Sequence, residues 1–256
     1  MRKLVRVFAV GWALHFKQES RNPFFLWIVI DTPLVYATMT YFLFRRSDPT
    51  TLVAAAVGTG LMGAWSLVTT AAAASLHRQR RAGVLELLVA APTPFWSVAL
   101  PITTAIAAIG MYSVGVGLLY VWLLFGVPVS IEDPIAFAVA LVPATISIGM
   151  LGFLLAAAFV RFRAAWAVGN LFEFPVWTVC GFLIPLAILP GWVEPVSWAL
   201  APTWAVGALG DAALGASAWE DIAMCLALSV VYGVLGSFAL RHFLHSARAN
   251  ASLSLT

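Results

Sequence analysis

The chain of 256 residues carries few charges. Charged residues make up 10% of it, hydrophobic residues make up 62%, and the mean hydropathy is +0.96. An ordinary soluble domain is about 25% charged and about 45–50% apolar. A water-soluble core of this size cannot take up so much apolar surface, so we exclude a single soluble domain. The composition indicates that lipid surrounds most of the chain.

Lysine is also scarce, since Lys3 and Lys17 are the only two. The basic residues form short clusters between long apolar runs, a pattern that sets membrane topology and does not suit nucleic-acid binding. Neither lysine follows a glycine at the spacing of a phosphate-binding loop. We therefore predict that this chain is not an enzyme with its own ATPase site.

The sequence offers little for catalysis or metal binding. Cys180 and Cys225 lie in separate apolar runs and cannot form a CxxC pair. His242 and His245 lie beside Arg241, and we interpret this group as a basic interfacial tail and not as a metal site. No GxSxG, HExxH or DxD motif occurs. We predict no catalytic residue, no metal site and no cofactor bound by this chain.

Six stretches are long and apolar enough to cross a bilayer as helices, which takes about 20 residues each. Period-two alternation, typical of membrane β-strands, is absent. The sequence therefore predicts an all-α membrane protein with one transmembrane domain over residues 1–256. The predicted spans are 24–44, 52–76, 98–125, 135–160, 164–189 and 222–240.

Basic residues outside these spans lie mostly on one face of the membrane. Twelve lysines and arginines fall on that face, and only Arg45 and Arg46 fall on the other. The positive-inside rule then places both termini in the cytoplasm, which agrees with an even number of spans. We expect a multi-pass protein of a bacterial plasma (inner) membrane.

Two further segments are amphipathic or broken by proline. In residues 1–21 one helical stripe holds Phe8, Trp12 and Phe16, which predicts a helix lying in the cytoplasmic interface; an ordinary basic flank is the alternative. Residues 190–218 are apolar but too often interrupted by proline to span. We predict two short re-entrant helices there, on the outer face.

The cytoplasmic connection 77–94 begins with a basic cluster and ends with two prolines. Glu86 lies among leucines in its middle. A short amphipathic helix parallel to the membrane would present the polar residues of this connection to a cytoplasmic partner, although an interfacial helix without a partner fits as well. The candidate coupling residues are Arg78, Arg80, Arg81, Gly83 and Glu86.

Two carboxylates lie inside predicted spans. Asp31 and Glu173 each fall roughly 12–14 Å from the cytoplasmic end of their span. A carboxylate facing lipid is costly, so each should face the protein interior or a cavity, or else be protonated and neutral. Phe172 and Trp177 lie near Glu173 in the sequence. These four residues either line a path for a cationic or hydrogen-bonding substrate, or the two acids form structural hydrogen bonds between helices.

Two segments resemble the permease subunits of type-2 ATP-binding-cassette exporters, a family of bacterial drug, lipid and polysaccharide exporters. The connection at 80–92 is similar to that family's motif between spans two and three, with Val84 in place of the usual threonine. The segment 189–212 is similar to the motif after span five, but Asp211 stands where members often carry arginine. The matching residues of the first motif are Gly83, Leu85, Glu86, Leu87, Leu88 and Pro92.

The resemblance implies a pair of permeases on two separate ATPase subunits, which bind ATP and magnesium. The second permease is either another copy or a paralogue. The connection 77–94 and the N-terminal helix would contact the ATPases, and spans one, two and five would line the path at the permease interface. ATP-driven efflux of a hydrophobic or amphiphilic substrate, such as a drug or lipid, follows as the expected function, with antibiotic resistance as its expected role.

Besides a membrane-embedded enzyme, which would need acid, histidine or serine groups clustered at one depth, two alternatives remain open at this point. One is export of a polysaccharide or teichoic-acid-type polymer. The eleven tryptophans support this alternative, because aromatic side chains would line the wider channel of such an exporter. The other belongs to a different class, a self-contained proton-coupled carrier or channel, which would need a polar pore or inverted repeats. The sequence leaves the substrate undetermined.

Overall fold

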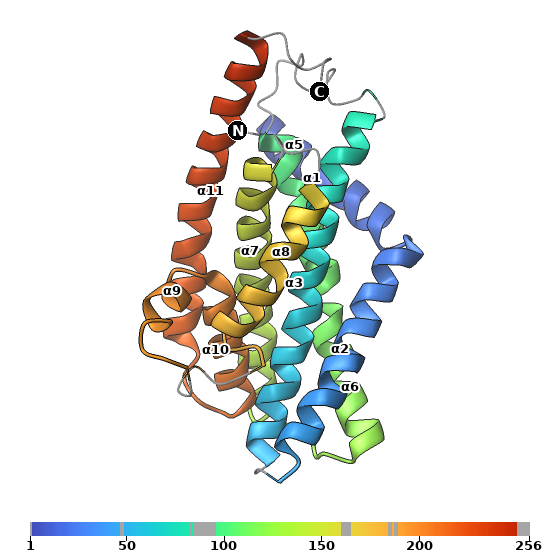
Figure 1. Ribbon diagram of the computed structural model, residues 1–256, viewed down its shortest axis with the longest axis vertical. Helices are drawn as coiled ribbons and strands as arrows, with labels where there is room; N and C mark the ends of the chain where they lie inside the picture. Colours follow the sequence, from blue (N-terminus) through green and yellow to red (C-terminus); the bar gives the residue numbers. More distant parts are fainter. Residues whose placement is uncertain are drawn as a thin grey trace.

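A computed structural model describes residues 2–46, 49–81, 83, 96–159, 165–183, 186 and 189–249. All elements in this part are helices, which confirms the prediction of an all-α membrane protein (Figure 1). They are α1 (Arg2–Glu19), α2 (Pro23–Phe44), α3 (Pro49–Arg81), α5 (Trp96–Gly110), α6 (Tyr112–Phe125), α7 (Pro134–Phe159), α8 (Ala165–Val179), α9 (Glu194–Trp198), α10 (Ala201–Ala213) and α11 (Trp219–Ala249).

Side-chain caps and prolines fix where two of the long helices begin. The Asn22 side chain accepts a hydrogen bond from the Phe24 N–H at 3.1 Å, and Pro23 is the first residue of α2. Asp133 accepts one from the Ala136 N–H at 2.8 Å, directly before α7. Such caps satisfy N–H groups that have no partner within the helix, and proline costs nothing at a first position.

The helix α3 forms the centre of the bundle. Leu61, Met62 and Trp65 are fully buried, and α3 contacts α2, α5, α6, α7, α8 and α10. By contrast, α2 and α11 lie at opposite edges of the bundle in Figure 1 and expose many large apolar side chains. An apolar edge of this kind suits lipid as the surrounding solvent.

The structure gives five helical stretches long and apolar enough to cross a membrane among the described residues. They are Pro23–Phe44, Thr50–Ala71, Trp96–Phe125, Pro134–Ala158 and Trp219–His242. The third comprises α5 and α6, which meet at Met111. These five stretches leave the predicted six-span count unconfirmed.

The predicted fifth span, 164–189, does not continue as one helix. Its described helix, α8, has 15 residues and ends at Val179. Gly181 then takes a positive φ of 77°, a conformation that ends helices and that glycine adopts without strain. The hydroxyl of Ser197 donates to the Val179 carbonyl at 2.6 Å and so satisfies a group at the end of α8. Reading residues 164–189 as one apolar helix overlooked this break.

The helix α3 also runs further than predicted. It contains 33 residues and spans roughly 50 Å, so it extends well beyond a hydrocarbon core of about 30 Å. Residues 77–81 therefore continue α3 and do not start a separate helix parallel to the membrane. Gly83 has a φ of +67°, which suits the end of a helix. Residues 84–94, including Glu86, lie outside the described part.

The segment 190–218 contains two short helices, α9 and α10, each with proline in its first turn. They lie beside the lower half of α11 in Figure 1, and α10 packs against α7, α11 and α3. Tyr232 of α11 holds the connection between them. Its hydroxyl donates to the Ala199 carbonyl at 2.6 Å and accepts from the Ala201 N–H at 3.0 Å.

Replacing Tyr232 by phenylalanine should loosen α9 and α10 from α11. The change removes both hydrogen bonds and leaves a buried N–H at the start of α10 unsatisfied, which costs about 2 kcal/mol. We expect a lower thermal unfolding temperature in detergent, followed by circular dichroism. Tyr112→Phe is the matched control, because Tyr112 is 59% exposed. Equal stability of the two variants would contradict the bracing role of Tyr232.

Candidate functional site

One face of α8 carries three side chains that can form hydrogen bonds. Asn170, Glu173 and Trp177 are spaced i, i+3 and i+7, so they share a face. This face is turned towards α3 and α2. The Glu173 side chain interacts with the Ser66 hydroxyl of α3, and the Trp177 ring packs edge-on against Tyr36 of α2 with ring centroids 4.8 Å apart. We call these five residues the polar seam.

Two of the four predicted path residues, Glu173 and Trp177, belong to this seam, and a third, Asp31, lies near it. Asp31 and Glu173 both lie close enough to Tyr36 for their charges to act on its hydroxyl. In the described part of the chain, neither carboxylate forms an ion pair with a basic side chain. Phe172 differs, because it lies on a neighbouring face of α8 and is 42% exposed. Neither carboxyl group therefore has a fixed positive partner among the described residues.

Several atoms of the seam are buried without a hydrogen bond of ordinary geometry to any described residue. They are Ser66 Oγ, Asn170 Oδ1 and Trp177 Nε1. Each unsatisfied buried polar group costs about 1–3 kcal/mol. Evolution retains such groups in proteins chiefly where water or a ligand satisfies them. The seam can thus donate and accept hydrogen bonds to a molecule that enters it.

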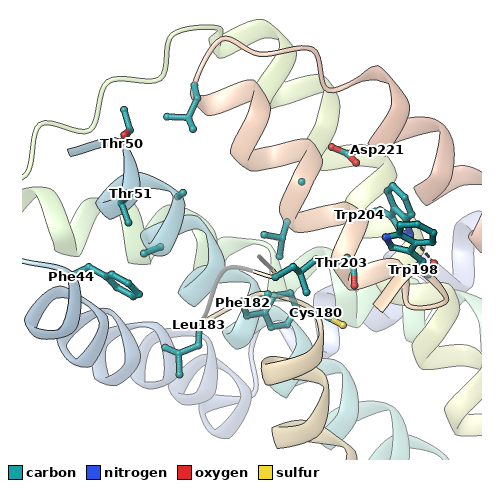
Figure 2. Close-up of a pocket in the computed structure, with 17 residues that line it drawn as sticks. Phe44, Thr50, Thr51, Cys180, Phe182, Leu183, Trp198, Thr203, Trp204 and Asp221 are labelled. Carbon is teal, nitrogen blue, oxygen red and sulfur yellow. Dashed lines mark hydrogen bonds between the residues drawn. The ribbon is translucent and has the colours of Figure 1, made fainter. Parts of the chain in front are cut away.

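A cavity of about 470 Å³ lies beyond the end of α8. It opens between α3, the segment after α8, and the helices α9, α10 and α11. Its walls are mostly apolar, with Thr203 and Asp221 among the few polar side chains. Residues that line it and are labelled in Figure 2 include Phe44, Thr50, Thr51, Cys180, Phe182, Trp198 and Trp204.

The polar face of α8 leads towards this cavity. Cys180 follows Trp177 by three residues, just past the end of α8, and lines the cavity. There the backbone of Phe182 lies directly against α3, because Gly58 has no side chain: a Cβ at Gly58 would be 2.1 Å from the Phe182 carbonyl oxygen. Trp204 Nε1 donates to the Trp198 carbonyl at 2.9 Å and ties α10 to α9 at the opposite wall (Figure 2).

Acidic side chains gather near the same end of the bundle. The Asp221 carboxylate lies over Gly207 of α10, where an added Cβ would be 2.6 Å from Asp221 Oδ2. Asp211 of α10 acts on Asp221 electrostatically. Burial raises the pKa of Asp211 above its ordinary value. The part of the bundle around this cavity therefore carries acidic as well as apolar side chains.

The remaining predicted site residues lie apart from the seam. The backbone of Arg78, Arg80 and Arg81 forms the last turns of α3, and Gly83 is exposed just beyond them. In α1, Trp12 and Phe16 stack with ring centroids 5.0 Å apart. Phe8 is half-buried on the same helix. The roles expected for these residues stay predictions.

Sequence reasoning missed Tyr36, Ser66 and Asn170. Asn170 could have been found, because it precedes Glu173 by three residues and so shares its helix face. Tyr36 and Ser66 carried no such signal. They lie on other helices, and only the packing of α2 and α3 against α8 places them beside Glu173.

Comparison with known proteins gives one family match. The sequence model of a family described as ABC-2 type transporter matches residues 6–213, which run from the second turn of α1 to the end of α10. No match to this chain was found among the curated proteins.

Proposed function

The chain belongs to the ABC-2 type transporter family and is a membrane permease, and from this premise we propose that it exports amphiphilic cations in an ATP-driven complex. The path runs along the polar seam between α2, α3 and α8 and ends at the cavity beside α9 and α10. Export of an amphiphile needs one surface that accepts its charged part and one that accepts its apolar part. The polar seam provides the first and the mostly apolar cavity provides the second.

The observation that carries this proposal is that two carboxyl groups, those of Asp31 and Glu173, lie within apolar helices and have no basic partner among the described residues. Asp31 and Glu173 act together on Tyr36, without a basic partner among the described residues. A carboxylate inside the membrane favours a bound cation, because its charge is costly in a low-dielectric medium without a counter-charge. The aromatic rings of Tyr36 and Trp177 can add cation–π attraction.

ATP hydrolysis belongs to other chains in this proposal. The sequence has no phosphate-binding loop of the GxxxxGK[ST] type. Two ATPase subunits would bind ATP and magnesium, and a second permease, identical or paralogous, would complete the path. Closure of the ATPases would push on the end of α3 and the connection that follows, and on α1. The complex would lie in a bacterial inner membrane with both termini of this chain in the cytoplasm.

Replacing Glu173 by glutamine tests the substrate class. We expect efflux of a monocationic fluorescent dye from cells or vesicles to fall roughly tenfold, which corresponds to the loss of about 1.4 kcal/mol of interaction with a charged group. Efflux of a neutral dye of similar size should change little. Glu194→Gln is the matched control, because Glu194 is exposed at the start of α9.

Unchanged efflux of the cationic dye by the Glu173 variant would contradict a transport role for this carboxylate and leave it as a structural hydrogen-bond partner. Equal loss for cationic and neutral dyes would indicate a damaged fold. Failure of the native complex to move any dye, together with export of a glycan polymer, would favour the polysaccharide alternative.

A further inference from the structure

A second surface of the bundle combines an apolar groove with one cation. The helices α5, α7 and α11 enclose a groove of about 530 Å³. None of its lining residues comes from α2, α3 or α8, so the groove is separate from the proposed path. Its apolar lining includes Trp96 and Leu100 of α5, Met150 and Phe153 of α7, and Val234 and Phe238 of α11.

Small residues of α11 bring α7 close enough to form the floor of this groove. A Cβ at Gly236 would lie 2.6 Å from Phe153 Cε1, and one at Gly233 would lie 3.0 Å from Met150 Cε. The α7 side chains therefore reach the backbone of α11. Larger α11 side chains stand beside this contact and form a wall, and Val234 is 63% and Phe238 71% exposed. The groove is thus open to the surrounding lipid.

The length of the groove matches one leaflet. The α11 residues that line it share one helix face from Val230 to Arg241, which are eleven residues and roughly 17 Å apart. Half of a hydrocarbon core of about 30 Å has nearly this depth. An acyl chain could therefore lie in the groove from the membrane surface to the midplane.

The charged end of the groove lies at a membrane boundary. Arg241 is the second-to-last residue of the span Trp219–His242, and Trp96 is the first residue of the span Trp96–Phe125. Arginine and tryptophan at such a level are typical of contact with lipid headgroups. Within the described part of the chain, no carboxylate forms an ion pair with Arg241, so its guanidinium is available for a phosphate, which it can bind with two hydrogen bonds.

We propose that this groove is a binding site for an anionic phospholipid. One acyl chain lies along α11 between α5 and α7, and the lipid phosphate binds Arg241. Basic sites between transmembrane helices at a membrane surface bind anionic headgroups by this arrangement. A zwitterionic lipid would fit the same groove but gains less from Arg241, because its headgroup carries its own positive charge.

Lipid retention by the purified chain tests the proposal. The native chain in neutral detergent is mixed with equal amounts of dioleoylphosphatidylglycerol and dioleoylphosphatidylcholine and passed over a size-exclusion column. Mass spectrometry then gives the number of each lipid retained per chain. We expect about fivefold preference for phosphatidylglycerol, the ratio that roughly 1 kcal/mol from one basic side chain gives, and loss of this preference in Arg241→Gln.

Two further variants separate the groove from general electrostatics. Val234→Trp fills the groove and should lower retention of both lipids, whereas Val231→Trp adds the same side chain to an exposed position of α11 outside it. Arg46→Gln removes a charge two residues past the end of α2 and should leave the preference unchanged. Figure 1 shows that end of α2 at the opposite end of the bundle from the last turns of α11.

Several results would overturn the proposal. If the native chain retained both lipids equally, or if Arg241→Gln kept the preference for phosphatidylglycerol, Arg241 would not bind the lipid phosphate. If Arg46→Gln lost the preference for phosphatidylglycerol as fully as Arg241→Gln, the preference would come from nonspecific attraction between the basic chain and anionic lipid. If Val234→Trp and Val231→Trp retained the same amount of lipid, the groove would not be the lipid-binding site. A chain that is dimeric in detergent and becomes monomeric only in Val234→Trp would assign the groove to a second copy instead of a lipid.

Discussion

Replacing Gly58 of α3 by alanine should strongly destabilise the fold. A Cβ at this position would lie 2.1 Å from the Phe182 carbonyl oxygen and 3.0 Å from the carbonyl carbon. Both atoms belong to the backbone, so no side-chain rotation relieves the overlap. We expect a loss of about 3 kcal/mol, at the upper end of what overpacking costs, measured as a lower unfolding temperature in detergent.

Gly115→Ala provides the matched control for this experiment. Gly115 also lies in an apolar helix, α6, but a Cβ there has no atom within 4 Å. Alanine favours helix over glycine by up to about 1 kcal/mol, so this variant should be as stable as the native chain or more so. If Gly58→Ala proved equally stable, the segment after α8 could not lie against α3 in the way described here, and the cavity beside it would have a different shape.

Reversing the charge of Arg81 should prevent capture of the partner ATPase. Arg81 is the last residue of α3, which extends beyond the hydrocarbon core, and the proposed coupling connection follows it. Loss of one charged contact at an interface costs 2 kcal/mol or more, roughly thirtyfold in affinity. We expect Arg81→Glu to reduce at least tenfold the ATPase that copurifies with the chain when it is co-expressed with the ATPase encoded beside it.

The control for this experiment is Arg46→Glu, which makes the same change two residues past the end of α2. Figure 1 shows that end of α2 at the opposite end of the bundle from the last turns of α3. This control variant should leave ATPase capture unchanged. Native-level capture by Arg81→Glu would remove the end of α3 from the proposed interface. If the native chain captures no ATPase and moves solutes alone in liposomes, the carrier alternative replaces the exporter.

The candidate site was only partly predictable. Glu173 could be singled out from the sequence because a carboxylate in an apolar run must face something other than lipid. Its neighbours could not, since Ser66 and Tyr36 are ordinary residues of other helices until the helices pack. Phe172 is the opposite case, a residue that the sequence placed in the site and the structure does not. It is adjacent to Glu173 in sequence, but successive helical residues point about 100° apart, and Phe172 lies on a neighbouring, more exposed face.

The sequence by itself determined that this chain is a helical membrane permease. Long apolar runs leave the backbone no partner in lipid except itself, so each long run must form a helix, and two motifs on that frame carry the resemblance to ABC-2 type transporters. The tertiary structure decided where the helices break and what meets there. The end of α8 at Val179 depends on Gly181 and on a hydroxyl from Ser197, eighteen residues further along the chain. The apolar composition of a segment does not predict such a contact, because it indicates only that the segment lies in lipid and not which residues pack against it.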